Sequence, residues 1–71
     1  MDNNDEIKIT TYDRLLRAWE NSMELTRDFE MYSKTIDDNE DVKKVFQEFA
    51  EDEGYHAAQF RKMIKEYDRN N

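Results

Sequence analysis

The sequence predicts an all-α protein built from one helical hairpin, and three observations carry that prediction. The 71 residues include no proline and one glycine, so few residues interrupt a helix. Apolar residues recur at intervals of three and four over two long stretches, which is the period of an amphipathic helix. A short acidic segment without apolar residues separates the stretches, and no strand pattern is present. We therefore expect residues 1–71 to form a single all-α domain.

The first element follows a loose start. Residues 1–10 are expected to be a flexible N-terminal lead, and a helix is predicted over residues 11–36. Thr10 or Thr11 can act as its N-cap, and Asp13 would lie in the first turn, where a carboxylate suits the helix dipole. The apolar stripe of this helix consists of Leu15, Leu16, Trp19, Met23, Phe29, Tyr32 and Ile36.

The second element is a helix predicted over residues 40–69. Residues 37–41 supply cap-type side chains before it. Because the turn is short, the two helices must fold back antiparallel. The apolar stripe of the second helix consists of Val42, Val45, Phe46, Phe49, Ala50, Ala57, Phe60, Met63, Ile64 and Tyr67.

Composition predicts self-association. Charged residues make up 41% of the chain and the hydrophobic set 37%, so a monomer would bury little apolar surface. Domains this small usually need disulfides, a metal or association, and the chain has no cysteine. An isolated helix pair covers only one side of each apolar stripe, whereas two hairpins enclose a core. We therefore expect a homodimer, or a multiple of dimers, forming a four-helix bundle.

The net charge of −7 disfavours binding of nucleic acid or anionic membrane surfaces. No run approaches the roughly 18 apolar residues of a membrane span. The acidic first residues do not resemble a secretory signal. The sequence thus predicts a cytoplasmic protein with no nucleic-acid or membrane partner.

Two residues break the apolar pattern of the second helix. Glu53 and His56, the only histidine, both fall near the centre of its apolar stripe. Buried polar groups of this kind must be paired, hydrogen-bonded or bound to a cation. Residues three apart share a helix face, so this E-x-x-H can direct a carboxylate and an imidazole at one ion. The alternative is a structural pair that hydrogen-bonds within the core.

A two-metal site also needs carboxylates from the first helix. Facing positions in the hairpin have numbers that sum to about 75, so Glu53 lies near the height of position 22. Glu20 and Glu24 are both within a turn of that height, whereas Glu30 is closer to the loop and can equally pair with a basic residue of another chain. Two hairpins would supply four glutamates and two histidines. This ligand set suits iron or manganese, and zinc remains possible.

Gly54, inside the E-x-x-H, costs about 1 kcal/mol relative to alanine in a helix. Three interpretations stay open for it. A partner backbone approaches closely there, the helix contains a π-bulge, or the glycine is a tolerated surface residue.

The stretch from Val42 to Ala58, VKKVFQEFAEDEGYHAA, resembles the second-helix motif of the rubrerythrin and ferritin-like di-iron carboxylate proteins. It has the apolar pair, the phenylalanine, an alanine three residues before the glutamate, and E-x-x-H-A. Full-length members carry two hairpins, whereas the encapsulated ferritins carry one and build a di-iron site across a dimer interface inside a protein shell. The resemblance implies that Glu53 bridges the metals and that His56 is a terminal ligand. Rubrerythrin-like spacing places the first-helix ligand at Glu20, and the shorter spacing falls on Met23, beside Glu24.

The resemblance implies a homo-oligomeric ferritin-like di-iron protein that oxidises ferrous iron with oxygen or peroxide, in iron handling or oxidant defence. One alternative is a metal-free helical dimer that acts as an interaction module. Another is a bundle stabilised by zinc or manganese without turnover.

Overall fold

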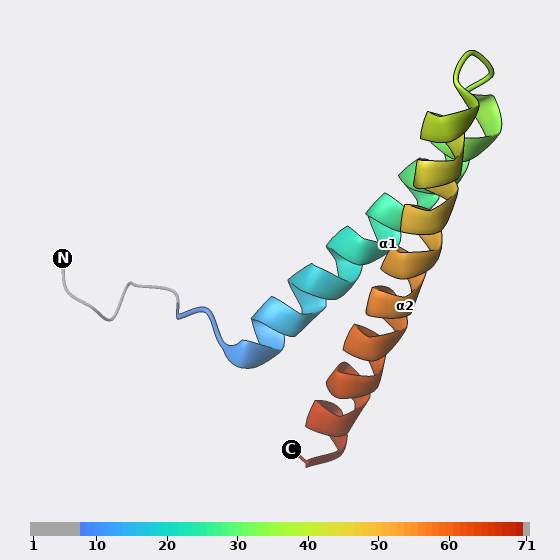
Figure 1. Ribbon diagram of the computed structural model, residues 1–71. Helices are drawn as coiled ribbons and strands as arrows, with labels where there is room; N and C mark the ends of the chain where they lie inside the picture. Colours follow the sequence, from blue (N-terminus) through green and yellow to red (C-terminus); the bar gives the residue numbers. More distant parts are fainter. Residues whose placement is uncertain (1–7, 71) are drawn as a thin grey trace, which may run out of the picture.

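The computed structural model describes residues 8–70, except for the side chain of residue 70. Two helices, α1 (Thr11–Thr35) and α2 (Glu40–Asn70), pack against each other in opposite directions (Figure 1). No strand occurs among the described residues. The predicted all-α hairpin is confirmed, whereas its dimerisation stays a prediction. Of the expected N-terminal lead, residues 1–7 lie outside the described residues.

A capping box starts α1. The Thr10 side chain accepts a hydrogen bond from the backbone N–H of Asp13 at 3.0 Å, and the Thr10 N–H donates to the Asp13 carboxylate at 3.1 Å. Hydrogen bonding to the Thr10 backbone, and then to its side chain, lowers the pKa of Asp13 below 3.8. Of the two candidate caps, Thr10 is therefore the one used. At the other end Ile36 is extended and donates its N–H to the Tyr32 carbonyl, so the helix ends at Thr35.

Asn39 caps α2. Its side-chain oxygen accepts a hydrogen bond from the Val42 N–H at 3.0 Å, which satisfies a backbone donor that the first turn leaves unpaired. Glu40 and Asp41 place negative charge in that turn. The helix is α-helical at every described residue around Gly54, so of the three interpretations of this glycine the π-bulge is excluded.

One unbroken row of buried or half-buried residues along each helix forms the interface between the helices. Steps of three and four separate the members of each row, as in a coiled coil. Small side chains fill the middle of the interface, where Ser22, Ala50 and Ala57 are buried. The row of α1 is Leu15, Trp19, Ser22, Thr26, Phe29, Ser33 and Ile36, and that of α2 is Lys43, Phe46, Ala50, Glu53, Ala57, Phe60 and Ile64.

Aromatic contacts hold both ends of the interface. Near the turn, the Phe29 ring centroid lies 5.5 Å from that of Phe46, and the Tyr32 ring packs edge-on to Phe46 at 5.2 Å. At the far end the Tyr12 and Tyr67 centroids are 6.0 Å apart. The Tyr12 hydroxyl also donates a hydrogen bond to the Asp68 carboxylate, which raises the pKa of Tyr12 above 10.0. These contacts fix the register of the two helices even though their axes diverge toward the termini in Figure 1.

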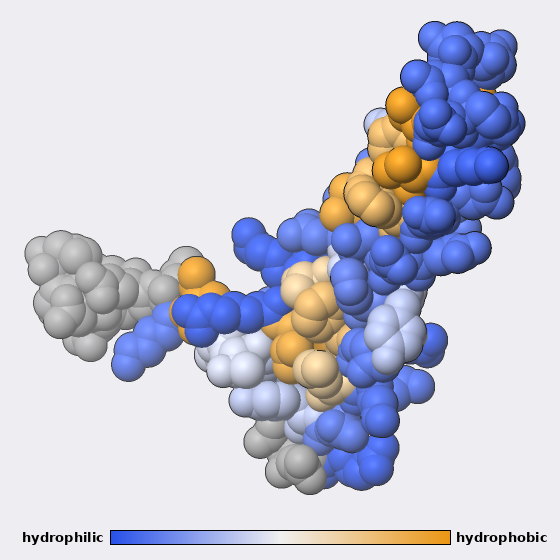
Figure 2. All heavy atoms as spheres, viewed as in Figure 1, coloured by the Kyte–Doolittle hydropathy of each residue, from blue (hydrophilic) through white to orange (hydrophobic). Residues whose placement is uncertain are grey.

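The hairpin encloses little apolar surface. Among the described residues no large side chain is fully buried, and the buried apolar residues are Ala50, Ala57 and Ile64. Figure 2 shows hydrophobic residues at the surface in two groups along the hairpin, each bordered by hydrophilic residues. Neither helix is long and apolar enough to cross a membrane.

Candidate metal centre

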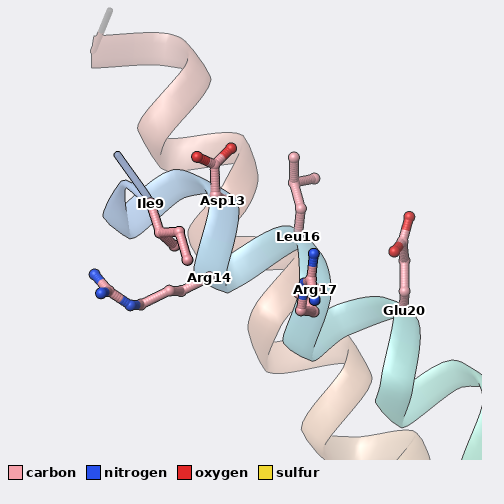
Figure 3. Close-up of a pocket in the computed structure, with 6 residues that line it drawn as sticks. All are labelled: Ile9, Asp13, Arg14, Leu16, Arg17 and Glu20. Atoms are coloured by element: carbon pink, nitrogen blue, oxygen red, sulfur yellow. The ribbon is translucent and has the colours of Figure 1, made fainter. Parts of the chain in front are cut away.

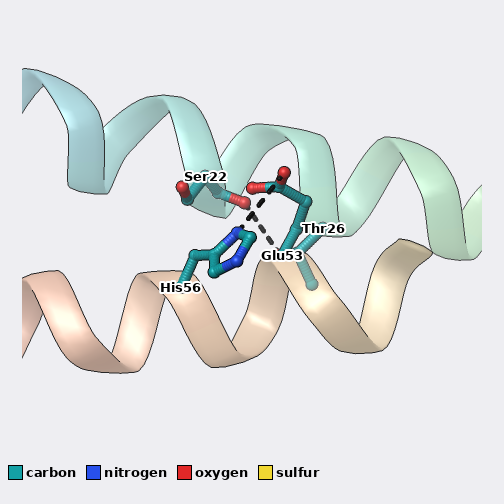
Figure 4. A network of polar contacts seen from close by, with 4 residues as sticks. All are labelled: Ser22, Thr26, Glu53 and His56. Carbon is teal, nitrogen blue, oxygen red and sulfur yellow. Dashed lines mark hydrogen bonds and ion pairs between the residues drawn. The ribbon is translucent and has the colours of Figure 1, made fainter. Parts of the chain in front are cut away.

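The centre of the candidate site is the pair Glu53 and His56, one turn apart on α2. His56 Nδ1 lies 3.7 Å from Glu53 Oε2, as Figure 4 shows. The Glu53 side chain is 23% exposed and that of His56 is 56% exposed. The structure thus brings the two side chains together, as the spacing predicted. His56 is exposed in the single hairpin, so the expected burial of both side chains between two hairpins stays a prediction.

Helix geometry explains this difference. Glu53 occupies the row of α2 that faces α1. His56 lies on the neighbouring row, in which residues seven apart recur on one side of the helix. The other members of that row, Val42, Phe49 and Met63, are all exposed apolar residues. His56 is therefore the one ionisable member of an otherwise apolar row, on a side of α2 that α1 does not cover.

Glu53 faces two small polar residues of α1. In Figure 4 its carboxylate reaches toward α1 between Ser22 and Thr26. The Thr26 hydroxyl donates to the Ser22 carbonyl at 2.7 Å, within its own helix, so this proton is not given to the carboxylate. No lysine or arginine of residues 8–70 pairs with Glu53, whose ion-pair partner is His56. The half-buried carboxylate therefore lies beside one imidazole and is paired with no basic side chain of residues 8–70.

The two candidate ligands of α1 lie elsewhere. Glu20 is exposed and lines a pocket formed by α1 and Ile9, which lies two residues before the helix (Figure 3). Glu24 is exposed in a second pocket, which α1 residues alone line. Among residues 8–70 no three potential ligands come together to hold a metal ion.

The predicted pairing of heights was close, because the numbers of Phe29 and Phe46, whose rings are in contact across the hairpin, sum to 75. What separates Glu20 and Glu24 from the pair is the side of α1 on which they lie. Ser22 and Thr26 face α2, and Glu20 and Glu24 each lie two positions away from one of them, or about 200° around the helix. Glu30 is also exposed, at the edge of a groove with Gln47 and Gly54.

Sequence reasoning missed Ser22 and Thr26, which face the carboxylate. The sequence does contain a signal for them, because Ser22 and Thr26 continue the alternating intervals of four and three residues that lead from Leu15 to Phe29. They were passed over because their side chains are polar, so the apolar residues alone did not mark the true inner row of α1.

The geometry of the pair suits a metal. Carboxylate oxygens and imidazole nitrogens bind first-row metals at about 2.1 Å, so two atoms on one ion are separated by at most about 4.2 Å. The separation of 3.7 Å between Nδ1 and Oε2 falls within this limit. The donors fit iron, and one hairpin offers two of the ligands that such a site needs.

Comparison with known families decides the class of the protein. The family model for rubrerythrin matches residues 13–71. The chain belongs to the rubrerythrin family. Membership makes it a ferritin-like protein of a family that binds iron at di-iron centres, and the rubrerythrin match covers α1 from Asp13 onward, all of α2 and the Glu53–His56 pair. No curated protein and no solved structure matches the chain.

Proposed function

We propose that this rubrerythrin-family chain completes a di-iron site between two subunits and oxidises ferrous iron with oxygen or peroxide, in iron handling or oxidant defence. The observation that carries the proposal is the Glu53–His56 pair, whose atoms lie 3.7 Å apart in a family that binds iron. The pair provides an oxygen and a nitrogen donor at one point of α2.

A second subunit supplies what one hairpin lacks. The described residues gather no third ligand around the pair. The side of α2 that presents His56 also presents the exposed residues Val42, Phe49 and Met63. Burying such a row against a second copy is favourable, at roughly 25 cal/mol per Å² of apolar surface. A two-fold arrangement would add a second glutamate and a second histidine to the same site.

Glu53 and His56 have different roles in the proposed site. Glu53 holds iron with hard oxygen donors, which favour the ferric product. His56 would complete the ligand set with an imidazole nitrogen. Ferrous iron held by these residues would, as the substrate, supply the electrons for reduction of oxygen or peroxide. Glu20 and Glu24 are proposed as further ligands only in an assembly that turns the outer side of an α1 helix toward the site.

Metal content and native mass, measured on protein purified without chelator, test this proposal. We expect a dimer with one iron per subunit. Glu53→Gln and His56→Ala should each remove the iron and the oxidation of ferrous iron. Glu51→Gln is the matched control, because Glu51 is an exposed glutamate on the same helix and should keep both. Glu20→Gln and Glu24→Gln then decide whether α1 contributes a ligand.

A second candidate is a metal-free helical dimer that acts as an interaction module. It is favoured by the lack of a third ligand among residues 8–70. A stable dimer without iron, unchanged in mass and melting temperature by His56→Ala, would select it over the di-iron protein. Zinc or manganese in place of iron, with no oxidation of ferrous iron, would instead point to a metal-stabilised bundle.

A further inference from the structure

The outer side of α1 carries apolar residues that α2 does not cover. Ile9 is 62% exposed and Met23 38% exposed. Leu16 is half-buried and lines one surface pocket together with Ile9, and Met23 lines a second pocket. Both pockets are lined entirely by residues 9–27, as Figure 3 shows for the first. We call this side, centred on Met23, the outer α1 surface.

A row of four charged residues runs along the outer α1 surface. Its members lie seven residues apart and are all exposed. Their charges run in the order negative, negative, positive, positive, and no ion pair forms between them or with other described residues. The row is neutral as a whole, although the chain carries a net charge of −7. In chain order its members are Asp13, Glu20, Arg27 and Lys34.

This order of charges is complementary to itself when reversed. In an antiparallel pair of identical helices, residues at one level have numbers with a constant sum. A sum of 47 sets Glu20 opposite Arg27 of a second copy and Asp13 opposite Lys34 of that copy. Each contact occurs twice because of the two-fold symmetry. The apolar residue Met23 then lies beside the symmetry axis.

We propose that the outer α1 surface is an interface at which a second copy of this chain packs antiparallel, α1 against α1. A parallel copy would place like charges at the same level, which is unfavourable. The antiparallel copy matches opposite charges along the row and covers Met23 and Leu16. This contact is separate from the Glu53–His56 pair, which stays open to another subunit. It therefore extends the assembly beyond a single dimer and does not depend on metal binding.

Disulfide trapping tests the contact directly, because the chain has no cysteine of its own. Met23→Cys places one thiol next to the proposed axis and should give a disulfide-linked dimer under mild oxidation. Tyr55→Cys is the control, since Tyr55 is 65% exposed on α2, away from the outer α1 surface. It should remain mostly unlinked at the same protein concentration.

Charge reversal tests the register. Arg27→Glu in the Met23→Cys background sets two pairs of like charges opposite each other and should weaken association about tenfold. Adding Glu20→Arg should restore the cross-link, because the opposite charges are then exchanged. Circular dichroism checks that these exposed substitutions leave the helices intact.

The cross-linking results decide whether this interface exists. Trapping that is weakened by Arg27→Glu and restored by the exchange supports the interface, even if the protein binds no iron. The interface is overturned if Met23→Cys links no better than Tyr55→Cys, or if the reversal at Arg27 leaves trapping unchanged.

Discussion

Gly54→Ala should stabilise the protein. Gly54 is half-buried inside α2, and a Cβ atom built there would meet only the Thr26 Cγ2 atom, at 3.9 Å. That is an ordinary van der Waals distance, so the hairpin itself has room for the methyl group. Alanine is favoured over glycine in a helix interior by about 1 kcal/mol. We expect that gain in the free energy of unfolding, which corresponds to a rise in melting temperature of roughly 4–8 °C for a domain of this size.

Thermal and urea unfolding at matched protein concentrations would measure the effect, since association makes stability depend on concentration. Ala58→Gly is the control. Ala58 is exposed on the same helix, and the reverse change there should cost about 1 kcal/mol. If Ala58→Gly behaves as expected but Gly54→Ala lowers the melting temperature, the reasoning is refuted. The cause would then be a backbone from another subunit in contact with Gly54.

Three further predictions concern the caps, the open end and the interface of the hairpin. Asn39→Ala removes the acceptor for the Val42 N–H and should cost about 1 kcal/mol in urea unfolding, whereas Asn21→Ala on the exposed side of α1 should cause no loss of stability, because alanine is the better helix former. The hydrogen bond to Asp68 raises the pKa of Tyr12, so its contribution to stability is complete below pH 10.0 and is lost as pH rises through the raised pKa. Melting curves of the wild type should therefore approach those of Tyr12→Phe in strongly alkaline buffer, and parallel curves would contradict this. Ala57→Leu forces a larger side chain between the helices, where Ala57 is 4% exposed, and should cost about 1–3 kcal/mol. A neutral result would mean that the helices separate easily at this point.

The fold was predictable because local signals agreed with one another. Thr10 and Asp13 mark the start of α1. Asn39, followed in the chain by two acidic residues, marks the start of α2. Between these signals nothing breaks a helix, and the turn is too short for any arrangement but an antiparallel one. The helix ends depend on such side chain to backbone hydrogen bonds, which are short in range and can be read directly from the sequence.

The candidate site was predictable only in part, for a geometric reason. Glu53 and His56 share one helix, so their spacing fixes their proximity. The partners expected on α1 depended on how that helix is rotated about its axis. Its inner row is interrupted by the small polar residues Ser22 and Thr26, while apolar Met23 lies toward the outer side. Glu20 and Glu24 were selected by their height along the hairpin, and height alone does not fix the side of α1 on which a residue lies.

The contact between Tyr12 and Tyr67 has a practical consequence for protein engineering. It keeps the beginning of α1 and the end of α2 at one end of the hairpin, with ring centroids 6.0 Å apart. A peptide that joins two hairpins in tandem can therefore be short only if their open ends lie together, whereas for two copies packed antiparallel it must span the length of the molecule. Such a covalent fusion would allow one half to be altered while the other is kept, so that each histidine could be changed separately.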